Sequence, residues 1–221
     1  MRTQQPDLCR ELTLVNQGYK LIAGIDEAGR GAWAGPVVAA ACILPLEHVG
    51  LPRELFLVRD SKLLSPKQRD ACYICITAIA TCWEVGVVSA LEIDRLGILP
   101  ATRLAMVQAV TALAQSPGLL MIDAVRLSQL SIPQIVESKS DQHYLSVASA
   151  SIIAKVTRDR LMVSLGADYA GYGFARHKGY GTAQHRAALA ELGVCKQHRR
   201  SYRPIRALIN ARQPADSSSE E

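Results

Sequence analysis

The sequence lacks any long uninterrupted apolar run, although nearly half of its 221 residues are apolar. A membrane-crossing helix needs roughly 18 or more such residues in succession, so no membrane span is expected. The N-terminal segment MRTQQPDLCRELTLVNQ also lacks the apolar core of a secretory signal peptide. Charged residues make up 20% of the chain, a composition typical of a soluble globular protein. A cytoplasmic location is therefore the default expectation.

Nothing in the sequence indicates a disulfide framework, because the six cysteines follow no secretory signal. Cys72 and Cys75 have the CxxC spacing of a zinc or redox site. However, no second CxxC pair completes four ligands, and this pair falls inside a helical pattern. We interpret these thiols as small apolar core residues, with zinc as the alternative.

Acidic residues are nearly absent from residues 176–206, where only Glu191 carries a negative charge. The basic residues of the same span are Arg176, Lys178, Arg186, Lys196, Arg199, Arg200, Arg203 and Arg206. The whole chain has a net charge of only +5, so this excess is local. A local basic surface suits a polyanion such as nucleic acid, although a solvated protein face has the same composition.

Short apolar runs bounded by turn-forming residues predict the strands of one mixed sheet. We expect strands at 21–26, 37–44, 82–88, 119–123 and near 134–138. We expect helices from the Ser65-Pro66 cap to about 80, from the Ser89 cap, from near Pro100 to about 115, and at 144–165, 183–192 and 201–212. The last polar residues, QPADSSSEE, are expected to be disordered. This order of elements predicts an α/β fold with helices packed on the sheet.

Four acids occur where an uncompensated carboxylate is costly. Asp26 and Glu27 end the first expected strand, Asp123 ends another, and Asp141 precedes the buried helix at 144–165. Desolvating a charge is unfavourable, and a divalent cation held by oxygen ligands offsets that cost. Two such ions can stabilise both the attacking and the leaving oxygen of a phosphodiester. Taken singly, Asp123 and Asp141 fit a cap, a turn or a salt bridge better.

The adjacent positions of Asp26 and Glu27 leave a question open. Neighbouring side chains on an extended strand point to opposite faces of the sheet. Either the strand ends between these two residues, or one of them contributes differently, for example through its backbone carbonyl.

Several segments resemble the blocks of a known family. AGIDEAGRGAWAGPVVAAACIL is similar to the opening signature of the type 2 ribonuclease H family, in which Asp-Glu precedes a Gly-Arg-Gly turn. Further similar blocks follow in order over residues 21–204: RDSKLLS, MIDAVRL, KSDQHYLSVASASIIAKVTRDRLM, HKGYGT and HRRSYRP. On these blocks the chain is identified as a member of this family, and it looks most like the ribonuclease HII subfamily.

The resemblance implies a ribonuclease H-like fold, with a mixed five-stranded sheet flanked by helices and a small C-terminal helical extension. It implies a preamble at 1–20, a catalytic domain with its extension at 21–204, and the end of the last helix with a tail at 205–221. It also implies dependence on Mn²⁺ or Mg²⁺ and hydrolysis of the RNA strand of RNA–DNA hybrids. A monomer is expected. Within the subfamily it implies cutting 5′ of a single ribonucleotide in duplex DNA, as in ribonucleotide excision repair, leaving 3′-hydroxyl and 5′-phosphate ends.

Roles carry over by position. The metal-binding catalytic carboxylates would be Asp26, Glu27, Asp123 and Asp141. The substrate contacts would be the Gly29-Arg30-Gly31 turn at the ribonucleotide, Tyr180 at the next nucleotide, and Lys62, Arg199 and Arg200 at phosphates. Glycine lets a backbone approach a ligand closely, and recognition of a 2′-hydroxyl needs hydrogen-bond partners, although a purely structural turn also uses glycine. Lys155, on the buried helix, is expected to need a partner.

The chain departs from the family pattern at Ala32-Trp33 and at Ala124-Val125, which puts the rigidity of the first loop and the substrate contacts of the second turn in doubt. Two other functions remain as alternatives. A sister subfamily prefers runs of ribonucleotides but usually carries an extra N-terminal domain, whereas about 20 residues precede the first strand here. A non-catalytic nucleic-acid-binding module is disfavoured, because four carboxylates facing phosphate would only weaken binding.

Overall fold

The fold is built on a five-stranded mixed sheet with strand order β3-β2-β1-β4-β5. The computed structural model describes residues 5–46, 55, 57–58 and 61–212. β1 (Ile22–Ala28) pairs antiparallel with β2 (Val37–Ile43), which pairs antiparallel with β3 (Cys82–Val88). On its other side β1 pairs parallel with β4 (Leu119–Asp123), and β4 pairs parallel with β5 (Gln134–Glu137). The five expected strands are confirmed, with ends that differ by up to two residues.

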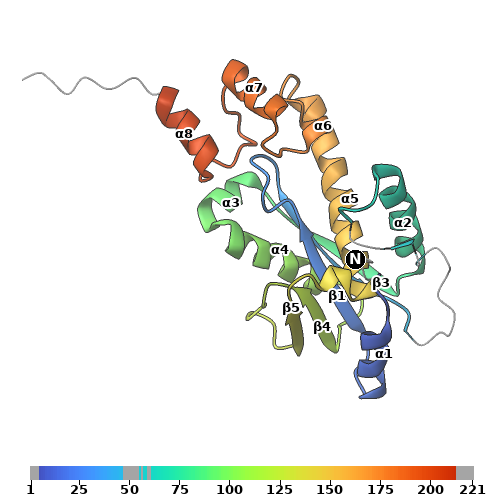
Figure 1. Cartoon of the computed structure of the whole chain (residues 1–221). Coiled ribbons are helices and arrows are strands. Elements are labelled where there is room, and N and C mark those ends of the chain that lie inside the picture. The colour runs from blue at the N-terminus through green and yellow to red at the C-terminus, as the bar shows by residue number, and fades with distance from the viewer. Residues whose placement is uncertain (1–4, 47–54, 56, 59–60, 213–221) are drawn as a thin grey trace, which may run out of the picture.

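Helices cover both faces of the sheet and gather at one end of it (Figure 1). The helical elements are α1 (Cys9–Asn16), α2 (Pro66–Ile79), α3 (Ala90–Leu96), α4 (Ile98–Ala112), η2 (Ser140–Gln142), α5 (Leu145–Asp168), α6 (Phe174–His177), α7 (Ala183–Leu192) and α8 (Arg203–Arg212). α4 packs on one face, and α5 packs on the other with α2 outside it. The helices α6, α7 and α8 form the expected C-terminal extension beyond one end of the sheet.

The alternation of side chains along β2 explains the two-layered core. Ala39 and Ala41 contact the α4 side, whereas Ala40 and Cys42 contact the α5 side, and all four are buried. Small side chains let both helices approach the central strands closely. A strand buried on both faces therefore appears in the sequence as a continuous apolar run instead of an alternating one.

Two expected helix starts are confirmed by their caps. Ser65 and Gln68 form a reciprocal capping box at the start of α2, and Ser89 and Glu92 form another at the start of α3. The expected tail lies outside the described residues. No helix in the described part of the chain is long and apolar enough to cross a membrane.

The expected preamble contains a docked helix, α1, that the sequence reasoning missed. The Glu11 carboxylate is fully buried, and its Oε1 accepts hydrogen bonds from the Ser146 amide (3.0 Å) and hydroxyl (2.9 Å). These groups belong to the first turn of α5, where amide groups have no partner within the helix. α1 therefore caps the long helix that begins just after Asp141.

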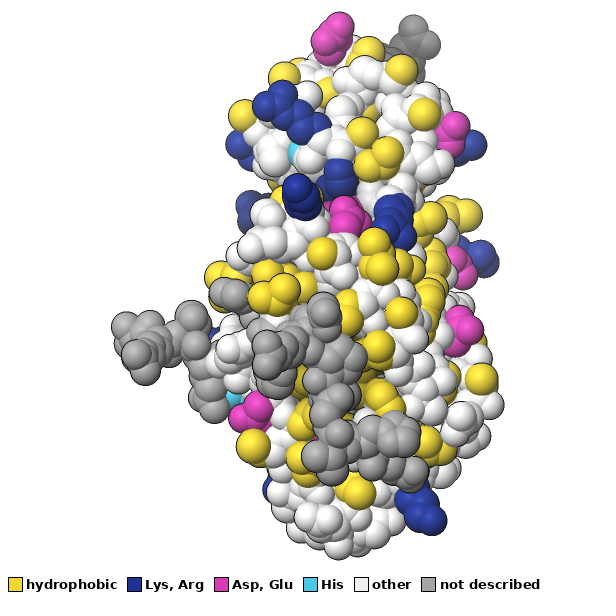
Figure 2. All heavy atoms as spheres, turned by 90° about the vertical axis from the view of Figure 1, so that its right-hand side faces the viewer, with side chains coloured by type: hydrophobic (Ala, Val, Ile, Leu, Met, Phe, Trp, Pro, Cys, Tyr) yellow, Lys and Arg dark blue, Asp and Glu magenta, His cyan; other side chains and the backbone are white. Residues whose placement is uncertain are grey.

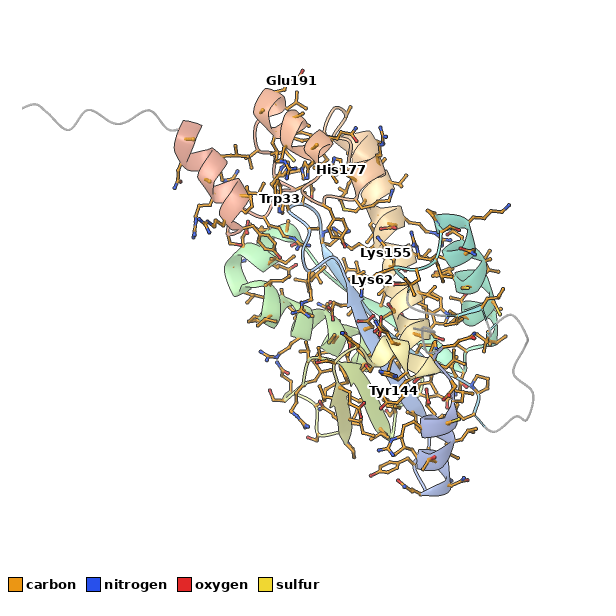
Figure 3. The ribbon with its side chains drawn as sticks, viewed as in Figure 1. Trp33, Lys62, Tyr144, Lys155, His177 and Glu191 are labelled. Atoms are coloured by element: carbon orange, nitrogen blue, oxygen red, sulfur yellow. The ribbon has the colours of Figure 1, made fainter. Side chains whose placement is uncertain are left out.

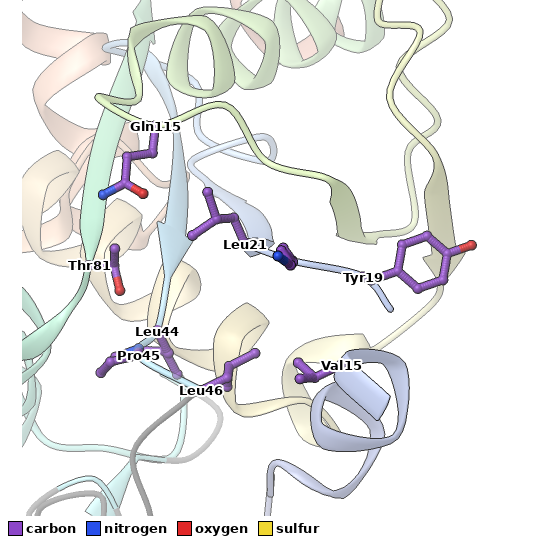
Figure 4. A pocket seen from close by; sticks show the side chains of 9 residues that line it. Val15, Tyr19, Leu21, Leu44, Pro45, Leu46, Thr81 and Gln115 are labelled. Carbon is purple, nitrogen blue, oxygen red and sulfur yellow. The ribbon is translucent and has the colours of Figure 1, made fainter. Parts of the chain in front are cut away.

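A hollow of about 340 Å³ lies at the beginning of β1 (Figure 4). Among the residues that line it are Val15, Leu21, Leu44, Leu46 and Thr81. Because Asp26 and Glu27 lie toward the other end of β1, this hollow is separate from the carboxylates.

Candidate active site and nucleic-acid interface

The four expected carboxylates are brought to one end of the sheet by parallel strand pairing. Asp26 and Glu27 both lie within β1, and Asp123 is the last residue of β4, whose Ile122 pairs with Ile25 of β1. The Asp123 Oδ1 accepts a hydrogen bond from the Ser140 amide (3.0 Å), which ties the end of β4 to η2 and so to Asp141. Asp26 and Asp141, which are 115 positions apart in the sequence, therefore lie at the same end of the sheet.

The open question about Asp26 and Glu27 is resolved by the strand register. Asp26 pairs with Ala40 and Glu27 with Ala39 of β2, so the strand continues through both residues. Their side chains leave it in alternating directions. Both carboxylates nevertheless interact electrostatically with Asp123. The strand does not end between them, as one of the two alternatives would require.

Burial and mutual repulsion perturb this cluster. Burial raises the pKa of Asp26 well above its usual value, and the charges of Glu27 and Asp123 raise it further. Burial also raises the pKa of Glu27, while Arg30, whose Nη1 lies 3.2 Å from Oε1, opposes that shift. The Glu27 Oε2 atom is buried and has no hydrogen-bond partner among the described residues. Arg30 thus offsets only part of the negative charge of the cluster, whose oxygen donors are those that Mg²⁺ and Mn²⁺ prefer.

The metal assignment itself stays a prediction. In the part of the chain that the structure describes, no three His, Cys, Asp or Glu side chains are placed so that they could hold a metal ion as they stand. Lys62 Nζ lies 4.0 Å from Asp141 Oδ2, and the lysine side chain is 79% exposed. Figure 3 shows Lys62 beside the α5 helix, below Lys155. The exposed Lys62 side chain therefore lies beside the carboxylate cluster.

The two glycines of the Gly29-Arg30-Gly31 turn have different surroundings. Gly29 has φ +97°, and a Cβ there would lie 2.0 Å from Nε of Arg158. Gly31 is exposed, and a Cβ there would meet no described heavy atom within 4 Å. Gly29 therefore makes room for Arg158, whereas the backbone at Gly31 is the part open to a ligand.

The loop that carries Tyr180 lies against this turn. The amides of Trp33 and Ala34 both donate to the Gly179 carbonyl, at 2.8 and 3.3 Å. The half-buried Tyr180 ring has Lys155 Nζ at 5.7 Å and Arg158 Cζ at 5.4 Å from its centroid. Tyr180 thus stands between the glycine turn and the cationic side chains of α5.

Lys155 has the partner that its position on α5 requires. Its Nζ lies 2.7 Å from Asp159 Oδ1, one helical turn further on. Figure 3 shows Lys155 on the same side of α5 as Lys62.

The basic C-terminal region is exposed except for the half-buried Lys178 and the buried Arg199. The exposed members are Arg176, Arg186, Lys196, Arg200, Arg203 and Arg206. Figure 2 shows Lys and Arg side chains around the waist where the C-terminal end meets the larger body. Arg199 is fully buried, with its guanidinium bonded to backbone carbonyls. The expectation that Arg199 contacts phosphate is therefore wrong for this structure, whereas Arg200 is exposed.

Ala124-Val125, the second departure from the family pattern, has a conformational consequence. Ala124 has φ +57°, in the left-handed region that favours glycine. A residue with a Cβ in that conformation costs roughly 1–2 kcal/mol. The turn after Asp123 therefore keeps a glycine-like backbone without a glycine.

Comparison with known proteins decides the family. A family model described as ribonuclease HII matches residues 23–205. The chain belongs to the ribonuclease HII family. Proteins named ribonuclease HII from Roseiflexus castenholzii and Chloroflexus aurantiacus are 53% and 52% identical to it. These alignments cover 93% and 94% of this chain and 92% and 99% of the relatives.

Solved structures agree with this assignment to the ribonuclease HII family. The ribonuclease H2 of Pyrococcus horikoshii matches with a TM-score of 0.74 at 27% identity, over 87% of this chain and 98% of that one. The RNase HII of Archaeoglobus fulgidus, solved with PCNA, matches with a TM-score of 0.68 at 28% identity, over 81% and 94%. A ribonuclease HIII solved with Mn²⁺ has a TM-score of 0.57 at 24% identity, which shows the shared fold alone. The protein is thus a ribonuclease H, an endonuclease for RNA–DNA hybrids.

Sequence reasoning missed two groups around the site of this ribonuclease HII. Arg158 lies in the family block at residues 139–162, but nothing in the sequence indicates that it is buried. The histidines His177, His185 and His198 lie within the basic span 176–206, but they are buried and pack together behind Tyr180. The His185 Nδ1 lies 3.1 Å from the Tyr180 carbonyl, and its Nε2 lies 3.0 Å from Nε2 of His198. They support the Tyr180 loop from inside.

Proposed function

We propose that this enzyme cuts duplex DNA on the 5′ side of a single embedded ribonucleotide, in addition to cutting RNA–DNA hybrids. The products are a 3′-hydroxyl and a 5′-phosphate. The proposal rests on one observation. The carboxylate cluster of Asp26, Glu27 and Asp123, whose negative charge is only partly offset, lies close to a glycine turn that is open at Gly31.

The carboxylates Asp26, Glu27, Asp123 and Asp141 would hold Mg²⁺ or Mn²⁺. When bound, such ions neutralise the cluster and stabilise the charge that develops on the phosphate during hydrolysis. The Gly31 backbone approaches the 2′-hydroxyl, the one group that distinguishes a ribonucleotide locally. The Tyr180 ring packs on the next nucleotide, and Lys62 and Arg200 attract the phosphates on either side.

The proposal extends to the setting of the reaction. We place the enzyme in the cytoplasm as a monomer that removes ribonucleotides from DNA, with residues 21–204 as the catalytic unit and its extension. The buried hydrogen bonds between Glu11 and Ser146 support the view that α1 docks on this catalytic unit and stabilises it.

The metal assignment is tested by Asp26→Asn and Asp141→Asn, with Asp70→Asn as the matched control. Asp70 is 54% exposed and pairs with Arg160, away from the carboxylate cluster. Both site variants should lose hybrid cleavage and bind Mn²⁺ more weakly in calorimetric titrations, because each removes an anionic ligand. Duplex binding should persist, since less negative charge cannot weaken attraction to phosphate. Wild-type cleavage and Mn²⁺ binding in both site variants would contradict the assignment.

A further inference from the structure

Two arginines without a carboxylate partner are buried beside the candidate recognition turn. Arg158 and Arg199 are both 0% exposed. Among the described residues, no carboxylate oxygen lies within 4.0 Å of either guanidinium. Burial is the first cause that lowers the pKa of Arg158, to about 10, and it lowers the pKa of Arg199 as well. Burying such charges is costly, so their hydrogen bonds must offset a large desolvation penalty.

Arg158 joins α5 to two loops. Its Nε donates to the Pro36 carbonyl (2.8 Å), its Nη2 to the Ala34 carbonyl (3.2 Å) and its Nη1 to the Lys178 carbonyl (3.0 Å). The first two carbonyls lie just before β2, and the third lies in the loop that carries Tyr180. The side chain also occupies the space beside Gly29.

Arg199 binds the same turn from the C-terminal block. Its Nε donates to the Gly35 carbonyl (3.0 Å), its Nη2 to the Pro36 carbonyl (3.1 Å) and its Nη1 to the Arg30 carbonyl (2.9 Å). Nη1 also donates to the Tyr202 hydroxyl, which donates in turn to the Arg30 carbonyl. The carbonyl at the centre of the Gly-Arg-Gly turn is thus held by two donors.

The arrangement uses what is particular to arginine. A guanidinium presents five donors in a rigid planar fork, so one side chain can hold carbonyls of separate segments in a fixed relation. A lysine at the same position would keep the charge, but its three N–H donors share one nitrogen and cannot span separate segments as the planar fork does. The two forks together fix residues 30–36 relative to the Tyr180 loop, the two segments proposed to contact adjacent nucleotides.

We propose that Arg158 and Arg199 are positioning residues that hold the Gly-Arg-Gly turn and the Tyr180 loop in register, and that this register sets the preference for a single embedded ribonucleotide over continuous RNA. The inference rests on the proposed function. A continuous RNA strand presents a 2′-hydroxyl on every nucleotide, so a loosened turn can still bind a 2′-hydroxyl in a position that allows cleavage. A single ribonucleotide offers one register only.

The test compares Arg158→Lys and Arg199→Lys with the wild type and with the control Arg160→Lys. Arg160 lies on α5 close to Arg158, but its side chain is 55% exposed and pairs with Asp70. For each protein, kcat and KM are measured on a duplex with one ribonucleotide and on an all-RNA hybrid. Loss of precise positioning can reduce a rate by about 10²-fold. We expect the ratio of kcat/KM, single ribonucleotide to hybrid, to fall at least tenfold in both site variants, mainly through kcat, and to stay unchanged in Arg160→Lys.

A merely structural role would lower both rates equally and leave the ratio within twofold of the wild type, which would overturn the inference. Should a lysine variant fail to fold, Tyr202→Phe removes only one hydroxyl from the network and should still lower the ratio several-fold. An unchanged ratio in Tyr202→Phe would equally overturn it. If the wild type itself leaves the single-ribonucleotide duplex intact, the proposed function fails instead, so the two failures are distinguishable.

Discussion

Replacing Gly29 by alanine should destabilise the protein, because the new methyl group would occupy the place of Arg158. The added Cβ would lie 2.0 Å from Nε of Arg158, and the residue would keep a φ of +97°. Left-handed backbone with a Cβ costs roughly 1–2 kcal/mol, and overpacking of a close-packed site costs roughly 1–3 kcal/mol. The free energy of unfolding should therefore fall by about 2–5 kcal/mol. At roughly 2–4 °C per kcal/mol for a chain of this size, Tm should fall by about 4–20 °C.

Gly31→Ala is the matched control within the same turn. No described heavy atom lies within 4 Å of a Cβ at Gly31, so thermal and denaturant unfolding should stay close to those of the wild type. The methyl group should instead reduce kcat/KM for cleavage, because it stands where substrate approaches. The reasoning is refuted if Gly29→Ala unfolds within about 0.5 kcal/mol of the wild type, the usual range for neutral surface changes, or if Gly31→Ala loses as much stability as Gly29→Ala.

Two further predictions concern charge. Burial lowers the pKa values of His185 and His198 to about 4, so both bind protons more readily when the chain unfolds. Their contribution to stability is present above pH 6.5 and is lost as the pH falls toward 4, with a slope of up to about 2.7 kcal/mol per pH unit for two protons. Urea unfolding at pH 7, 6, 5 and 4 measures that slope, and a flat profile would show that the histidines are not buried as neutral groups. For Arg200→Ala, the plot of log binding constant against log salt concentration should become shallower by about 0.9 if the side chain neutralises one phosphate. An unchanged slope in filter binding of the hybrid would make Arg200 ordinary surface.

The sheet and the cluster of acids were predictable because their signals are local. Each strand is a short apolar run, and the starts of α2 and α3 are marked by Ser65 and Ser89 with their capping partners three residues on. Asp26 and Asp123 were expected at the ends of apolar strands, where a divalent cation would offset the cost of desolvation, although only the parallel pairing of β1 with β4 brings them together.

The features that were missed depend on partners far apart in the sequence. Glu11 and Ser146 are 135 residues apart, so no local pattern links α1 to α5. Arg199 was expected at a phosphate because the family resemblance carries that role over by position, whereas its acceptors are backbone carbonyls that no sequence pattern identifies. The same reason hid Arg158. A side chain that binds main-chain groups leaves no partner residue type to find.

The most direct test of the central claim is the cleavage of an end-labelled DNA duplex that carries one ribonucleotide. In the presence of Mn²⁺ we predict one cut on the 5′ side of that ribonucleotide, a product that a polymerase can extend from its 3′-hydroxyl, and no cleavage with EDTA or of an all-DNA duplex. If the single-ribonucleotide duplex stays intact while duplexes with four or more ribonucleotides are cut, the claim is contradicted. The enzyme would then prefer runs of ribonucleotides.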